Sequence, residues 1–221
     1  MHTRRLLATL ALTTTLVHAQ LPGASGEIQA VVTDESSKPL ADAVVIAVPI
    51  DGNMRLTSRP RDEVDQVDKE FTPRVKVVLV GSTVTFPNND SVRHQVYSFS
   101  PAKRFELPLY AGVPPEPVVF NKPGLVVLGC NIHDWMVGYI YVSESPYFAK
   151  TGLDGKATLA DLPPRAYVLR VWHPQLDASE ESTQKTIEVV RGKRSDAAWA
   201  LKVKLVAKVR RAPIAGGAGR Y

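Results

Sequence analysis

The sequence predicts an all-β protein built from sandwich domains. Short segments rich in Val, Ile, Tyr and Thr recur along the chain, and Gly, Pro, Asn and Asp separate them. No long stretch keeps the period of an amphipathic helix. Many short strands with turn signals between them are typical of β-sandwiches and barrels. The 221 residues are enough for one or two hydrophobic cores.

Twelve segments are expected as strands, each a β-branched or aromatic run that ends at a turn signal. They are residues 27–34, 42–49, 75–80, 82–86, 94–99, 117–120, 124–130, 136–142, 156–162, 166–173, 185–190 and 197–204. Gly81 separates the third from the fourth, and "NKPG" separates the sixth from the seventh. The dipeptide Asp154-Gly155 precedes the ninth, and Pro163-Pro164 follows it.

The first nineteen residues have the pattern of a secretory signal peptide. A basic start, MHTRR, precedes the apolar run LLATLALTTTLV, and Ala19 supplies the small residue of a cleavage site. The apolar run is too short to cross a bilayer, and no other run in the chain is long enough. We therefore expect residues 1–19 to be removed on export, and the mature chain to be periplasmic with no transmembrane segment.

The formal net charge of +5 is unevenly distributed. Residues 191–221 hold nine Lys or Arg and one Asp, whereas residues 20–190 carry more acidic than basic groups. The high isoelectric point therefore reflects a basic tail rather than a basic body, and no nucleic-acid partner is expected. We expect residues 206–221 to be a basic, flexible tail. It is either merely solvated or able to touch a membrane surface or an acidic partner.

The segment "CNIHDWM" at 130–136 concentrates side chains that bind soft metals. It contains the only cysteine of the chain, Cys130, together with His133 and Met136. A single cysteine cannot form an intrachain disulfide, so it is inert, bonded to another chain, a ligand or a nucleophile. The segment joins two predicted strands, and this loop can turn three side chains toward one point.

His94, at the start of another predicted strand, is a fourth candidate ligand. Two imidazoles, one thiolate and one thioether are the donors of a blue-copper electron-transfer site, in which the methionine is a weak axial ligand. Taken singly, each of these residues is more often a core or satisfied polar residue. Their combined spacing, the flanking strands and the predicted export favour copper.

Residues 62–146 resemble a cupredoxin of the plastocyanin, pseudoazurin and amicyanin group. The C-x2-H-x2-M loop is of the short amicyanin type, and "TFPNNDSVRHQV" is similar to the segment that carries the first histidine. The resemblance implies a Greek-key β-sandwich over 52–148 that holds one type 1 copper per chain. It implies His94, Cys130 and His133 as equatorial ligands and Met136 as the axial ligand.

The resemblance also implies residues around these ligands. Gln95 and Asn131 would tie the two ligand loops together, and Asn89 would support the first histidine. His133 would be the electron port, with Trp135 and Asp134 beside it for partner docking. Trp135 could instead fill the core beneath the loop.

Two outer segments resemble parts of one carboxypeptidase-regulatory-like, or transthyretin-like, sandwich. Residues 26–50 are similar to its opening hairpin. Residues 151–205 are similar to a later part, with the turn at Asp154-Gly155 and the strand around Tyr167. The cupredoxin-like region would then be inserted into this second small β-sandwich or packed beside it.

The predicted function is single-electron transfer without substrate conversion, so the chain is not expected to be an enzyme. A multicopper enzyme needs further histidines, and only His173 remains in the mature chain, where we expect it to be a packing or surface residue. Expected partners are a c-type cytochrome or a periplasmic dehydrogenase, and the amicyanin-like loop suggests methylamine utilization. The alternative is a non-catalytic module that stores copper or binds a carbohydrate or another surface.

Overall fold

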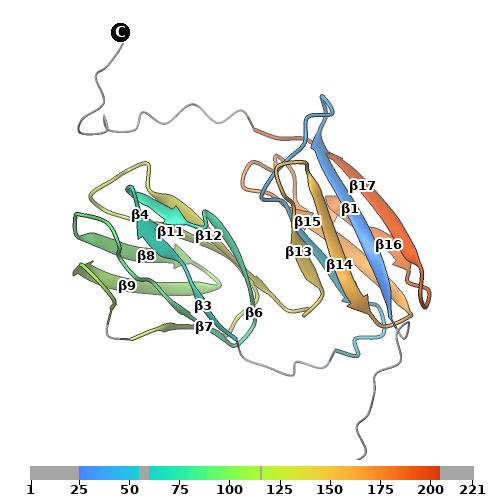
Figure 1. Cartoon of the computed structure of the whole chain (residues 1–221), viewed down its shortest axis with the longest axis horizontal. Helices are drawn as coiled ribbons and strands as arrows, with labels where there is room; N and C mark the ends of the chain where they lie inside the picture. The colour runs from blue at the N-terminus through green and yellow to red at the C-terminus, as the bar shows by residue number, and fades with distance from the viewer. Residues whose placement is uncertain (1–24, 55–59, 115, 205–221) are drawn as a thin grey trace, which may run out of the picture.

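The computed structural model describes residues 25–54, 60–114 and 116–204, and these residues form an all-β structure (Figure 1). The fold class predicted from the sequence is therefore confirmed. Within these ranges the only helical element is a 3-10 turn, η1 (Glu180–Thr183). No helix in the described part is long and apolar enough to span a bilayer. The predicted signal peptide (1–19) and basic tail (206–221) lie outside the described residues.

The two ends of the described chain form one sandwich of two sheets. One sheet has the order β14-β1-β17, formed by Lys156–Leu162, Gly26–Asp34 and Arg194–Leu201. The other has the order β13-β2-β15-β16, formed by Phe148–Lys150, Val44–Pro49, Ala166–Trp172 and Lys185–Glu188. Their facing side chains share one core, in which Ile28, Leu159 and Tyr167 are almost fully buried. The regulatory-like identity of this outer sandwich stays a prediction.

The residues between β2 and β13 form a second set of sheets with a core of their own. A five-stranded sheet has the order β6-β12-β11-β8-β9, formed by Val75–Leu79, Val137–Ser143, Gly124–Gly129, His94–Ser100 and Lys103–Tyr110. Facing it are β10-β7-β3 (Val118–Phe120, Ser82–Thr85 and Arg61–Glu63) and the hairpin β4-β5 (Asp65–Val67 and Glu70–Thr72). Phe86, Phe120 and Leu128 fill the space between the sheets.

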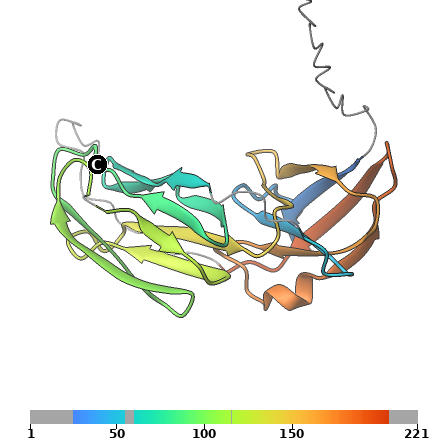
Figure 2. The same cartoon turned by 90° about the horizontal axis from the view of Figure 1, so that it is seen from below.

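The two halves lie side by side and touch through an apolar seam (Figures 1 and 2). Trp172 of β15 packs against Tyr139 and Tyr141 of β12, with ring centroids 5.5 and 5.9 Å apart. Val44 and Val75 belong to the same buried cluster. The outer face of the five-stranded sheet is therefore covered at the β6–β12 side, and β8 and β9 lie away from the seam.

The sequence reading missed several strands, of which β9 matters most for the site. Its sequence "KRFELPLY" alternates charged and apolar residues and contains Pro108, which argues against a central strand. β9 lies at the edge of its sheet, where a missing backbone donor costs little. The short strands β3, β4, β5 and β13 were also missed, each being only three residues long.

Candidate metal centre

The predicted ligand loop is a tight connection between β11 and β12. Cys130 directly follows β11 and is 4% exposed. The backbone N–H of Met136 donates to the His133 carbonyl at 2.9 Å, and the N–H of Val137 donates to the Trp135 carbonyl at 3.0 Å. These bonds fold the loop back before β12 begins, which keeps His133 within reach of Cys130.

His94 enters the site from the first position of β8. The pairing of β8 with β9 is regular from Val96 onward but shifts between His94 and Val96. An irregularity of this kind re-aims side chains next to functional sites. The His94 side chain is fully buried, and its Nδ1 lies 3.8 Å from the Cys130 sulfur.

His94, Cys130 and His133 form a group that could hold a metal ion. Their candidate donor atoms all lie within 4.8 Å of one another. Bonds of about 2.1 Å to nitrogen and about 2.3 Å to sulfur, opened at about 120°, place the two donors about 3.8 Å apart. The distance between His94 Nδ1 and Cys130 Sγ has this value, so the pair fits one trigonally coordinated metal.

The His133 imidazole has a buried nitrogen that lacks a hydrogen-bond partner in the described part of the chain. Nδ1 of His133 is buried and makes no hydrogen bond to any described residue. The pKa of His133 is lowered from its ordinary value, first by burial and then by repulsion from His94 and Lys69, against a smaller attraction to Asp90. A neutral imidazole with a buried, unpaired nitrogen is a ready metal ligand.

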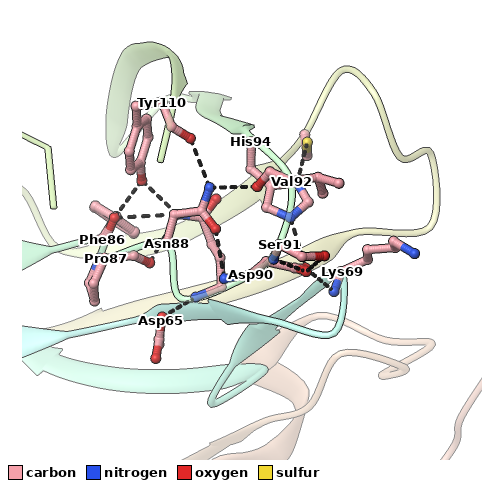
Figure 3. Close-up of polar contacts among 12 residues, drawn as sticks. Asp65, Lys69, Phe86, Pro87, Asn88, Asp90, Ser91, Val92, His94 and Tyr110 are labelled. Atoms are coloured by element: carbon pink, nitrogen blue, oxygen red, sulfur yellow. Dashed lines mark hydrogen bonds and ion pairs between the residues drawn. The ribbon is translucent and has the colours of Figure 1, made fainter. Parts of the chain in front are cut away.

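Asp90 fixes the tautomer of His94 (Figure 3). Its Oδ2 lies 3.0 Å from His94 Nε2, and both side chains are more than nine-tenths buried. The pKa of Asp90 is lowered: burial opposes ionisation, but hydrogen bonds from His94 and from the Lys69 backbone outweigh it. Because an ionised carboxylate only accepts hydrogen bonds, Nε2 carries the proton and Nδ1 presents its lone pair to the site.

The tip of the β4–β5 hairpin donates a second hydrogen bond to Asp90, besides the one from His94. Asp68 and Lys69 connect β4 to β5 as a two-residue turn in which both residues have positive φ, at 52° and 59°. That conformation is typical of a type I′ turn, which matches the twist of the flanking strands. It aims the Lys69 N–H at Asp90 Oδ2, 2.6 Å away.

Asn88 holds the loop between β7 and β8 in shape. Its side-chain amide donates to the carbonyls of Val92 and Tyr110 at 3.0 and 2.8 Å, and its oxygen accepts the Asp90 N–H at 3.0 Å (Figure 3). Gln66 donates to the Tyr110 hydroxyl at 2.6 Å. The Asn88 side chain, with its amide and its oxygen both hydrogen-bonded, makes a rigid support for His94, whereas the buried Gln66 Oε1 has no partner among the described residues.

Gln95 and Asn131 connect the two ligand-bearing segments. The Asn131 amide donates to Gln95 Oε1 at 2.5 Å, and the Gln95 amide donates to Glu106 Oε1 of β9 at 2.5 Å. Hydrogen bonds therefore link Asn131, which follows Cys130, to Gln95, which follows His94. They continue from Gln95 to the edge strand β9.

The remaining predicted site residues lie at different depths. Met136 is 1% exposed and belongs to the same core cluster as Cys130. The Trp135 ring is partly buried and lies 5.1 Å from the His133 ring. Asp134 is exposed and is not among the charged groups that shift the pKa of His133. Asn89 donates to Asp65 at 2.8 Å, in the hairpin rather than at the histidine.

Sequence reasoning missed Asp90, which binds His94, and Asn88, which holds the loop that carries Asp90. Asp90 and Asn88 lie in "PNNDSVRH", and an acid four residues before a candidate histidine was a usable signal. His173 is buried in the outer sandwich, where its Nε2 lies 3.1 Å from the Ala41 carbonyl. It is a packing residue far from the candidate ligands in the fold.

No protein-family model and no curated protein matches the chain. Among solved structures, it is similar to a purple cupredoxin from Nitrosopumilus maritimus, with 26% identity over 37% of this chain and 99% of that chain and a TM-score of 0.34. A Sinorhizobium pseudoazurin has 24% identity over 39% of this chain and 76% of that chain, with a TM-score of 0.31.

A third similar structure is an enzyme, a copper-containing nitrite reductase from Thermus scotoductus. It has 28% identity over 52% of this chain, with a TM-score of 0.36, and this chain spans 28% of its length. The similar solved structures therefore include both small cupredoxins and a reductase.

Proposed function

We propose that the chain binds one type 1 copper through His94, Cys130, His133 and Met136 and carries single electrons between redox partners. The observation that carries the proposal is the convergence of two imidazoles and one thiol from separated segments, within 4.8 Å. The buried and unpaired Nδ1 of His133 supports it, because such an atom is rare unless a ligand completes it.

The donor set favours copper over zinc. Structural zinc sites use four strong Cys or His ligands, whereas this group offers three, with Met136 in the same buried cluster as Cys130. A thiolate with two imidazoles in one plane and a weak thioether above it suits both Cu(I) and Cu(II). When bound, copper would supply a one-electron couple whose geometry changes little between the two states.

The protein's own residues would hold and tune this couple. Asp90 keeps His94 in the tautomer that offers Nδ1, and the Asn131–Gln95–Glu106 chain keeps the two segments in register. His133 is partly exposed and follows the half-exposed Ile132, so its ring would offer a path between solvent and the metal. His133 and Trp135 then form the electron port.

The biological setting is also a proposal. The N-terminal pattern supports export to the periplasm, where a c-type cytochrome or a dehydrogenase would exchange electrons with the chain. The regulatory-like outer sandwich would hold the copper-binding half in place through the seam at Trp172. The basic tail would contact a membrane surface or an acidic partner.

Copper reconstitution tests the proposal directly. Adding one equivalent of Cu(II) to the metal-free chain should produce strong visible absorption from the Cys130 thiolate. The matched variant Cys130→Ser should stay colourless while keeping its β-sheet circular dichroism. A copper-loaded protein without visible absorption would favour the storage alternative, and a chain that binds no copper would contradict the assignment.

A further inference from the structure

The outer sandwich presents an exposed leucine at the tip of a tight turn. Leu153 lies in the connection between β13 and β14 and is 92% exposed, the largest exposed fraction among the large apolar side chains of the described residues. Two hydrogen bonds close the turn: the Gly152 N–H donates to the Lys156 carbonyl, and the Gly155 N–H donates to the Gly152 carbonyl, both at 3.0 Å. The turn therefore holds an apolar side chain in water, where contact with an apolar surface would stabilise it.

Gly155 fixes this turn against the end of β1. Its φ of 71° lies in the left-handed region, and a Cβ at this position would come within 2.5 Å of the Val32 carbonyl oxygen. Asp154 Oδ1 accepts the Lys156 N–H at 3.0 Å, so the carboxylate is held next to Leu153. Leu153 and Asp154 form a preorganised projection, called here the Leu153 knob.

The other half of the chain carries an apolar depression on the outer face of its five-stranded sheet. The depression has a volume of about 340 Å³ and is lined by Tyr97, Phe99, Val127 and Val137, among others. Because a cavity of about 150 Å³ accommodates benzene, this one has room for a leucine side chain. Phe99 is 72% and Val127 is 39% exposed, so the depression is open to solvent. The chain's own Leu153 does not fill it, since that side chain is itself exposed.

Two cations border the depression. Arg104 of β9 pairs with Phe99, so its exposed side chain lies on the same face of the sheet. Lys122 reaches the tip of the β8–β9 hairpin, where its Nζ donates to the Pro101 carbonyl at 3.2 Å. The acid on this face, Glu106, already accepts a hydrogen bond from a side-chain amide of β8.

The knob carries the opposite charge. Asp154 is exposed and makes no ion pair with any described residue; its only printed bond is to the backbone of its own turn. Lys156 belongs to β14 already, where it pairs with Val31 and its side chain lies on the sheet face rather than at the tip of the turn. An apolar tip with an acid beside it therefore complements an apolar depression with basic borders.

We propose that the Leu153 knob of one copy of this chain docks in the depression of another copy, with Asp154 facing Arg104 and Lys122. The knob belongs to the outer sandwich and the depression to the other half (Figure 1). The two surfaces are unlike, so the contact is heterologous: repeating it builds a ring or a filament, unless a two-fold axis closes two such contacts into a dimer. The contact needs no metal, so the inference goes beyond the proposed function and is tested separately from it.

Sedimentation of the metal-free chain measures the self-association, with a thiol reductant present to prevent disulfides between copies through Cys130. The weight-average mass should rise with concentration between about 10 µM and about 1 mM. Leu153→Asp and Phe99→Asp should each weaken the association constant about ten- to hundredfold or more, which is the contribution of burying one large apolar side chain. Val119→Asp is the matched control, because Val119 is 45% exposed on the opposite sheet.

Mixing the two variants tests which surfaces meet. Leu153→Asp keeps the depression and Phe99→Asp keeps the knob, so each alone should stay monomeric, whereas an equimolar mixture should form a 1:1 dimer and nothing larger. Arg104→Gln should weaken the wild-type association less than Leu153→Asp does. Its effect should shrink between about 0.01 M and about 0.15 M ionic strength, because salt screens exposed charges.

Amide NMR of the wild-type chain locates the contact without any substitution. The signals of Leu153, Asp154, Phe99 and Val127 should shift together as the concentration rises. A chain that stays monomeric at about 1 mM, a variant mixture that does not associate, or shifts confined to other surfaces would overturn the inference. None of these outcomes bears on copper binding, which the visible spectrum reports.

Discussion

Replacing Asp90 by Asn should raise the reduction potential of the copper site. The substitution keeps the size of the side chain and an oxygen that can accept the His94 Nε2–H, but it removes the negative charge. Both side chains are more than nine-tenths buried, so water screens their interaction little. A carboxylate on the far side of the imidazole makes His94 a stronger donor and stabilises Cu(II) over Cu(I).

The expected size follows from the geometry. The Asp90 oxygen is 3.0 Å from Nε2, and a metal on Nδ1 would be about 4 Å from Nε2, which gives a separation of about 7 Å. At an effective dielectric constant of about 20, one unit charge at that distance changes the energy of the couple by about 2.4 kcal/mol, or about 100 mV. The Asn dipole and structural relaxation reduce this value, so we expect a rise of about 50 to 100 mV.

Voltammetry of the two copper-loaded proteins measures the shift, and nitrogen NMR of the metal-free proteins reports the His94 tautomer independently. In the native chain the proton should be on Nε2, and in Asp90→Asn both tautomers should be detectable. Asn89→Ala is the matched control, because Asn89 bonds Asp65 instead. An Asp90→Asn protein with an unchanged or lower potential would refute the role given to this carboxylate.

Three further predictions concern Met136, the histidines and the seam. Met136→Leu should keep copper and colour and raise the potential, since it removes axial electron donation to Cu(II); an unchanged potential in voltammetry would make Met136 a packing residue only. The metal-free chain should lose stability as pH falls below about 6.5. Burial lowers the native pKa of His133 and His173, so the unfolded chain binds more protons there. Urea titrations between pH 7 and 5 should show the loss, and His173→Gln should reduce it. Trp172→Ala should cost about 3 kcal/mol in urea unfolding, because it empties the seam against Tyr139 and Tyr141; a loss well under 1 kcal/mol would mean that the seam contributes little.

The sequence predicted the features of the fold and of the candidate site that depend on the local residue pattern. The all-β class followed from β-branched runs and turn residues, and most predicted strands lie within a few residues of the observed ones. The proximity of Cys130 and His133 was predictable, because a three-residue spacing on a short loop leaves them little freedom. The strand β9 was not, because Pro108 and charged residues at an edge strand look like a loop when neighbouring strands are unknown.

The residues around His94 show which contacts cannot be predicted from the local sequence pattern alone. Asn88, Asn89 and Asp90 are adjacent polar residues in a loop, and their residue types do not say which one faces the histidine. The choice depends on the hairpin tip at Lys69, whose N–H binds Asp90 from a segment about twenty residues earlier. Contacts of this kind are set by how strands pack, so the sequence reading assigned the supporting role to Asn89.

The candidate metal site draws its geometry from one shared strand arrangement. β8 carries His94 at its start and pairs with β11 at Tyr97 and Gly129, so the same pairing fixes both His94 and Cys130. A shift of one residue in this register would turn His94 away from Cys130 and Tyr97 away from Gly129 together. The regular pairing of β8 with β9 beyond Val96, the buried support from Asn88 and the Gln95–Asn131 bond all resist that shift. The geometry of the candidate ligands and the close packing of Tyr97 on Gly129 are therefore two consequences of a single strand register.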